Sequence, residues 1–306
     1  MGFTEDPHLR SLEGMSLRVL ASGSGGNSSV LVIGRGGVRR VCLIDLGLSP
    51  RRTSRLLAES GLSLSDVDDV LLTHLDSDHY FRTWSRLLPR HVRVRVHAHH
   101  QRCAAEAGIP PALLAPFDDR FIIQADLGGA VVSPSVNAHD AMGSVAFRID
   151  LNLGDSTASL GYATDLGHVP DRLVAHMRGV DVLAIESNYC PRMQEVSDRP
   201  MFLKRRITGG AGHLSNQQCR DAIRGINPCG HVVLLHLSRE CNLPEVAAIE
   251  HAGARYSLTI SLQNEPTGWV AVSPRPAAPR PVVRHRQAGL FESMLGARVP
   301  TAGAAQ

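Results

Sequence analysis

The sequence predicts an α/β fold, with one domain over about residues 16–272. Two observations predict it: short apolar runs rich in β-branched residues recur along this span, and stretches of helical periodicity lie between several of them. Hydrophobic residues make up 43% of the chain, enough apolar material for a large core. Residues 1–15 are expected to be a flexible N-terminus. Residues 273–306 are rich in proline and arginine and cannot build a core, so a disordered C-terminal tail is expected there.

The apolar runs have the length and composition of β-strands. In chain order they cover residues 17–33, 41–47, 67–74, 92–98, 145–151, 159–165, 180–187, 231–238 and 257–262. Helices are expected over residues 49–61, 171–179, 215–226 and 243–253. The first of these helices has Ser49 as its N-cap and ends at Gly61.

Charge and cysteine content narrow the class of protein. The net charge of +3 is small, so composition alone gives no strong case for nucleic-acid binding. The six cysteines are scattered without a C-x-x-C pair, which favours buried thiols in a reducing compartment over disulfides or a cysteine-zinc site. Residues 1–15 lack the apolar core of a signal peptide, and no apolar stretch reaches the roughly 18 residues of a membrane span. A cytoplasmic protein without a membrane segment is therefore expected.

Polar side chains recur where the predicted strands end, at Asp45, His74 to His79, Asp165, Glu186 and His236. Loops converge at this edge of an α/β sheet, so these side chains are expected to form one site. Imidazoles and carboxylates are the ligands that divalent metals need, and two ions need a bridging carboxylate. The candidate ligands are His74, Asp76, Asp78, His79, His139, Asp165, His213 and His236.

The densest part of this set is LLTHLDSDHY, residues 71–80. Two histidines and two aspartates lie within six residues at the end of a predicted strand, a pattern specific for a metal site. The histidines of VHAHH (96–100) are expected instead to be ordinary surface or core residues, because a chain with 15 histidines contains some clusters by chance.

These motifs resemble the metallo-β-lactamase superfamily. HLDSDH is similar to the superfamily's H-x-H-x-D-H motif, with Asp76 in place of the second histidine. LIDLG, NAHDAMGSVAFRI, GYATDLG and LLHLS follow in the family's order and supply Asp45, His139, Asp165 and His236. The resemblance covers nearly the whole domain and implies a four-layer αβ/βα sandwich.

Other segments are similar to the WalJ (YycJ) group of that superfamily, which is related to the PhnP phosphodiesterases. They are SGSGGNSSVLVI, AIESNYCPRM, LKRRITGGAGHLSN and LLHLSRECN. This resemblance implies a hydrolase that cleaves phosphodiesters with two divalent ions, Zn²⁺ or Mn²⁺. It further implies a 5′-to-3′ exonuclease that prefers single-stranded DNA.

The same resemblance implies a role for each site residue. The metal ligands fall into two sets joined by a bridging aspartate: His74, Asp76 and His139 for one ion, Asp78, His79 and His236 for the other, and Asp165 between them. Asp45 is implied to support the site. Asp78 is expected to serve as the base beside the attacking water, and His213 to protonate the leaving oxygen. Substrate contacts are expected from Ser22, Asn27, Lys204, Ser215 and Asn216, although Lys204, the only lysine, could equally be a solvated surface residue and SGSGGN a tight turn between strands.

Asp76 departs from the superfamily's pattern. An aspartate still offers an oxygen ligand, but it is shorter than histidine and negatively charged, which favours harder ions such as Mn²⁺ over Zn²⁺. A decaying site would carry non-ligands at Asp78, His79 or Asp165, and all three are present, so an altered but occupied site is expected. ESNYC (186–190) also departs from the S-N-H-D expected of the group, which indicates a difference in substrate choice.

Two other functions stay open at this point. One is a small-molecule hydrolase acting on a cyclic phosphodiester, and the other is a non-catalytic regulatory or DNA-binding protein that has kept the fold. Arginine-rich segments such as residues 82–95 favour a polyanionic polymer, single-stranded DNA in the first place. In the tail, QAGLF (Gln287–Phe291) is similar to sliding-clamp-binding peptides, which makes a sliding clamp a candidate partner; the alternative is a short amphipathic segment that packs on the domain.

Overall fold

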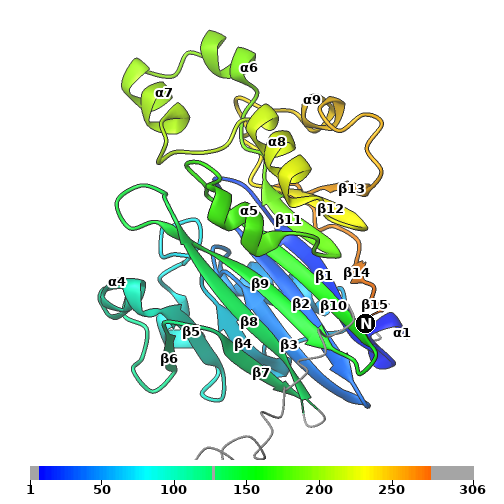
Figure 1. Cartoon of the computed structure of the whole chain (residues 1–306). Helices are drawn as coiled ribbons and strands as arrows, with labels where there is room; N and C mark the ends of the chain where they lie inside the picture. Colours follow the sequence, from blue (N-terminus) through cyan, green and yellow to red (C-terminus); the bar gives the residue numbers. More distant parts are fainter. Residues whose placement is uncertain (1–6, 126–127, 277–306) are drawn as a thin grey trace, which may run out of the picture. The chain divides into compact units, whose positions relative to one another are not determined.

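Two β-sheets face each other, with helices on their outer sides (Figure 1). This computed structural model describes residues 7–125 and 128–276. The α/β fold expected from the sequence is confirmed. Each expected strand run overlaps an observed strand, and each expected helix overlaps an observed helix. The tail, including Gln287–Phe291, lies outside the described residues.

The first sheet has the order β14-β1-β2-β3-β4-β5-β6. Its strands are β1 (Gly14–Ala21), β2 (Ser28–Arg35), β3 (Val38–Ile44), β4 (Val67–Leu71), β5 (Arg93–His97), β6 (Leu114–Phe117) and β14 (Val270–Val272). β1, β2 and β3 pair antiparallel, whereas β3 to β6 pair parallel. Parallel strands end at the same edge, so the loops after β3 and β4 meet there.

The second sheet repeats this arrangement with the order β13-β12-β11-β10-β9-β8-β7, and β15 pairs with β10. Its strands are β7 (Phe121–Ala125), β8 (Gly128–Asn137), β9 (Ser144–Asn152), β10 (Ser156–Ala163), β11 (Val182–Glu186), β12 (His231–Leu235), β13 (Ser257–Ile260) and β15 (Arg275–Pro276). β7 to β10 pair antiparallel and β10 to β13 parallel. The loops after β10, β11 and β12 therefore also share one edge.

Three buried apolar clusters separate the layers. One lies between the sheets, with Leu31 and Phe147 among its members. A second packs the first sheet against its helices through Leu57 and Trp84, and a third does the same for the second sheet through Leu173 and Ile223. The helices are α1 (Pro7–Arg10), α2 (Pro50–Ala58), α3 (Trp84–Leu87), α4 (Gln101–Glu106), α5 (Asp171–Met177), α6 (Pro191–Val196), α7 (Met201–Thr208), α8 (Asn216–Ile226) and α9 (Pro244–Ile249), with 3₁₀ turns at Leu64–Asp66 and Ala98–His100. Three cores between four layers make the αβ/βα sandwich.

Several elements differ from the sequence-based expectation. The run 17–33 is two strands, because the chain turns at residues 22–27 between β1 and β2. β8 was not predicted, since its glycines and Pro134 are typical of turns, yet it pairs with β9 from Ala130 to Asn137. α6 and α7 were not predicted either. The folded part also starts earlier than residue 16 and ends later than 272, with Leu9 only 1% exposed and β15 reaching Pro276.

In the described part of the chain, no helix has the length and apolar character that a membrane span requires.

Candidate metal centre

The candidate site lies at the strand ends of both sheets, where three residues adopt a left-handed backbone. Asp45 follows β3 with φ 63°, Asp165 follows β10 with φ 54°, and His236 follows β12 with φ 56°. Side chains other than glycine rarely take this conformation, and such residues cluster at functional sites. All three side chains take part in the contacts of the candidate centre.

Gly47, in the LIDLG motif, allows the two strand-end loops of the first sheet to approach closely. A Cβ at this position would lie 1.8 Å from the carbonyl oxygen of Asp78. Only glycine therefore lets the segment after β3 pack against the loop that carries His74 to His79.

The first ligand set is His74, Asp76 and His139, whose metal-binding atoms lie within 4.8 Å of one another. His74 Nδ1 lies 3.0 Å from the Thr73 hydroxyl, which itself donates to Asp45 at 2.8 Å. The hydroxyl must therefore accept from His74 Nδ1, which leaves Nε2 unprotonated. His139 Nδ1 likewise donates to the Gly212 carbonyl at 3.0 Å, which directs Nε2 of both histidines toward the proposed metal position. Asp76 is the most solvent-exposed residue of this set, with its side chain 52% exposed and its Oδ2 3.9 Å from His74 Nε2.

The second ligand set is Asp78, His79 and His236, again with ligand atoms within 4.8 Å. His79 is fully buried and donates from Nδ1 to Asp45 Oδ2 at 2.7 Å. His236 Nε2 lies 3.3 Å from Asp78 Oδ2, and its backbone N–H donates to the Ser22 hydroxyl at 2.8 Å. Every member of this set is therefore held by further contacts.

Asp165 lies between the two sets. Its Oδ2 is 3.0 Å from His79 Nε2, and its Oδ1 is 3.8 Å from His139 Nε2 and 3.4 Å from His236 Nδ1. The carboxylate is buried, which by itself would raise its pKa. The imidazoles of His236 and His79 outweigh the burial and hold the pKa of Asp165 well below its usual range. The group is ionised, as a bridging ligand must be.

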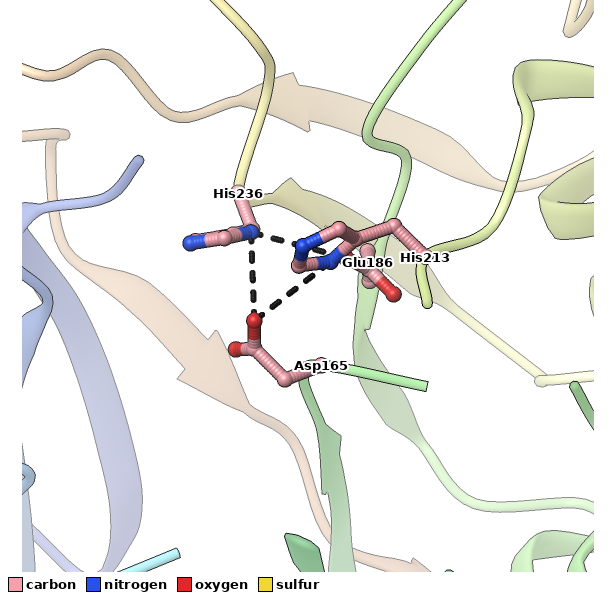
Figure 2. Close-up of side chains that lie close together, drawn as sticks. All are labelled: Asp165, Glu186, His213 and His236. Atoms are coloured by element: carbon pink, nitrogen blue, oxygen red, sulfur yellow. Dashed lines mark hydrogen bonds and ion pairs between the residues drawn. The ribbon is translucent and has the colours of Figure 1, made fainter. Parts of the chain in front are cut away.

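Glu186 belongs to the same cluster, although the sequence marked it only as a polar residue at a strand end. Figure 2 shows its side chain with those of Asp165, His213 and His236, all pointing toward one another. Its Oε1 accepts from His213 Nδ1 at 2.6 Å, and its Oε2 accepts from the Leu166 backbone N–H at 2.8 Å. The position of Glu186 at the end of β11, parallel to β10 and β12, was the signal that could have found it.

The histidines of the centre differ in the direction in which their surroundings shift the pKa. Burial, followed by the neighbouring His79, holds the pKa of His74 well below its usual value, so His74 is neutral. Burial also lowers the pKa of His236, but the carboxylates around it outweigh this and raise the pKa to about 10. Glu186 likewise outweighs burial and raises the pKa of His213. The pKa values of neighbouring histidines are thus shifted in opposite directions within one cluster, a separation typical of functional sites.

The expected substrate contacts have more varied surroundings. Asn27 is at the centre, where its Nδ2 lies 2.9 Å from His79 Nε2, and Ser22 donates to Asn27 Oδ1 at 3.1 Å. Ser215 is the N-cap of α8 and accepts from the Gln218 N–H. Asn216 is buried and bonded to Ser187 and Asn242. Lys204 donates to the Glu195 carbonyl at 2.6 Å. The hydrogen bonds of the last three serve the fold.

The histidines at 96–100 lie outside this cluster, as expected for ordinary residues. His100 is buried and its Nε2 donates to the Met142 carbonyl at 3.0 Å, while His97 caps the following 3₁₀ turn.

The donor set of the centre fits divalent metal ions. His74 Nε2 is buried and has no hydrogen-bond partner among the described residues. Leaving such an atom unpaired costs about 1–3 kcal/mol, and a metal ligand is the role in which this nitrogen needs no hydrogen. The neighbouring ligand atoms are carboxylate oxygens and imidazole nitrogens, which are ligands that zinc and manganese both accept.

Comparison with known proteins agrees with this geometry. A family model described as "Beta-lactamase superfamily domain" matches residues 40–237. The chain is 30% identical over 240 residues to the exodeoxyribonuclease YycJ of Bacillus anthracis, an alignment covering 76% of this chain and 86% of that one. It is 29% identical over 240 residues to the exodeoxyribonuclease WalJ of Streptococcus pneumoniae, with the same coverage. Among solved structures, the metallo-beta-lactamase fold protein YhfI of Bacillus subtilis superposes with a TM-score of 0.59 at 15% identity, over 84% of this chain and 100% of that chain.

Proposed function

Because the chain belongs to the beta-lactamase superfamily and is a metal-dependent hydrolase, we propose that it cleaves phosphodiester bonds of nucleic acid as a 5′-to-3′ exonuclease on single-stranded DNA. The observation that carries this proposal is the double ligand set joined by Asp165, with His213 beside it. Two relatives named exodeoxyribonucleases support the choice of substrate. We propose that the catalytic machinery lies within one domain. Nucleic acid is proposed to be the principal partner.

We propose that His74, Asp76 and His139 hold one divalent ion, that Asp78, His79 and His236 hold the other, and that Asp165 contacts both. Ions bound there would activate water and stabilise the negative charge that develops on phosphate oxygens.

The other polar residues move or position protons. His213 Nδ1 is occupied by Glu186, so its Nε2 is the nitrogen available to a substrate, and the raised pKa supplies a proton for the leaving oxygen. Asp78 is 24% exposed and close to His79 and His236, a position suited to accepting the proton of the attacking water. Asn27 and Ser22 position these groups, Asn27 through its contact with His79 and Ser22 through the backbone of His236.

Asp76 decides which metal works best. A carboxylate in place of an imidazole adds negative charge and a harder donor atom, so Mn²⁺ is proposed to be preferred over Zn²⁺ at the first ligand set. Its 52% exposure leaves room for the carboxylate to adjust to either ion.

The test is degradation of end-labelled oligonucleotides by the purified full chain, together with metal analysis. Single strands labelled at the 5′ end should release labelled mononucleotide first, in the presence of Mn²⁺, whereas strands labelled at the 3′ end should shorten progressively. Cleavage of a cyclic nucleotide but not of oligonucleotides would support the small-molecule alternative. A protein that binds oligonucleotides but contains no metal and cleaves neither would overturn the proposal.

A further inference from the structure

A polar cavity of about 270 Å³ opens beside His213. It is enclosed by the turn between β1 and β2, the loop after β8, and the segment of α6 and α7, which in Figure 1 extends away from the two sheets. The polar side chains that line it are Ser24, Asp140, Asn188, Arg199, Arg206, His213 and Ser238. Its floor therefore belongs to the candidate metal centre, and its wall carries two guanidinium groups.

The two arginines differ in how fully they are occupied. Arg199 is only 15% exposed and its donors bind Glu240, Gln194 and Ser238. It ties the α6–α7 segment to the loop after β12. Arg206 is 63% exposed and its one described partner is Asp140, which it contacts through Nε at 3.1 Å and through Nη2. A guanidinium has five N–H donors, so Arg206 has donors left for an anion in the cavity.

Asp140 holds Arg206 at the edge of the metal centre. Asp140 directly follows His139, and its backbone N–H donates to the Ala211 carbonyl at 2.7 Å. Arg206 directs both Nε and Nη2 at the Asp140 carboxylate, which makes the pair a two-pronged salt bridge at the mouth of the cavity.

The neighbouring basic residues of α7 do not reach this cavity. Lys204 donates to Glu195, and Arg205 is exposed; neither lines the cavity. Arg206 shares a helix face with Leu203, three residues away, and both line the wall. In LKRRIT it is thus the second arginine, and not the lysine, that faces the site.

We propose that Arg206 binds the phosphate adjacent to the scissile one in a single-stranded substrate, with Asp140 holding the guanidinium in place. This inference rests on the proposed function. Arginine binds phosphate oxygens in a fork, and Asp140 occupies only Nε and Nη2 of Arg206, so the remaining donors can bind a second anion. At about 270 Å³ the cavity is slightly smaller than a typical ligand pocket of about 300–1,000 Å³, which suits a small group such as one phosphate with its sugar.

The test compares Arg206→Ala with the wild type on two substrates. For a single-stranded oligonucleotide, KM should rise about tenfold or more, which is the usual effect of losing a charge-assisted contact, and the salt dependence of binding should weaken by about one counterion. For bis(p-nitrophenyl) phosphate, which has a single phosphate, kcat/KM should stay within about twofold. Metal content should be unchanged, and Arg205→Ala on the same helix should behave as the wild type.

An unchanged KM for the oligonucleotide would overturn the inference. So would an equal loss on both substrates, or a loss of metal, because either result would mean that Arg206 only positions His139 through Asp140. If the wild type itself fails to degrade oligonucleotides, the proposed function fails first, and that result is distinguishable from a variant-specific one.

Discussion

The two ligand sets of the metal centre use the same residue types but are held differently. In the second set, His79 is fully buried and bonded to Asp45, His236 is tied to Ser22 through its backbone, and each contacts Asp165. In the first set, Asp76 is half exposed and His74 keeps an unpartnered Nε2 among the described residues. The second ligand set is thus held rigidly and the first is open, which leaves room for a carboxylate such as Asp76 in place of an imidazole.

Asp165→Ala tests what the two sets share, and the largest effect is expected there. It removes the carboxylate that both sets contact and leaves buried imidazoles without a counter-charge. Nuclease activity should fall by about three orders of magnitude or more, since the ions supply most of the charge stabilisation. Metal content should fall at both positions. Asp155→Ala, at an exposed turn, is the matched control; activity in the Asp165 variant equal to that control would refute the site.

Asp45→Asn tests whether the second ligand set depends on its support. The buried Asp45 carboxylate accepts from the Thr73 backbone and hydroxyl and from His79 Nδ1. An amide can replace some of these bonds but cannot balance the imidazole's charge, so affinity for the second ion should fall about 10–100-fold. Titration of the metal-free protein with Mn²⁺ would show the second site weakened far more than the first, because Asp45 contacts His79 directly but reaches His74 only through Thr73. Equal weakening of both sites would contradict the independence of the two sets.

Asp76→His tests the adjustable set directly. Restoring an imidazole should shift the metal recovered with the protein from Mn²⁺ toward Zn²⁺, while activity with the preferred metal stays within about tenfold. Metal content measured after growth with both ions supplied is the readout, and Asp155→His at an exposed turn serves as control. An unaltered Mn²⁺ to Zn²⁺ ratio would mean that residue 76 does not bind the metal.

Lys204→Ala should have the smallest effect, because its amine bonds to the Glu195 carbonyl and lies outside both ligand sets. Oligonucleotide KM should stay within about twofold of the wild type, and the unfolding free energy should change by no more than about 0.5 kcal/mol. Steady-state kinetics and a denaturant melt check both. A KM effect as large as that expected for Arg206→Ala would show that the lysine reaches the substrate.

Much of the centre could be predicted from the sequence because its residues follow strands in recognisable local motifs. His74 to His79 lie within one loop, and Asp165 and His236 each end an apolar run. Asp140 and Arg206 could not be paired in this way, since they are 66 residues apart and meet only after the α6–α7 segment folds over the loop following β8.

The fold was also predictable where the local sequence pattern is clear. Strands with continuous apolar runs were found, because buried parallel strands need them on both faces. β8 was not found, because glycine and proline interrupt its pattern and the pairing with β9 overrides that local preference. α7 spans only Met201–Thr208 between Pro200 and Gly209, too short for periodicity to identify.

The left-handed backbones of Asp45, Asp165 and His236 have an evolutionary consequence. Each such residue stores strain of about 1–3 kcal/mol that glycine would relieve, so drift under selection for stability alone would favour glycine at these three positions and erase the centre. Two aspartates and a histidine at these positions, in place of glycine, are what a role of their side chains in the centre requires. Asp76 is not one of the three, so a change of donor atom there leaves the strained backbone untouched.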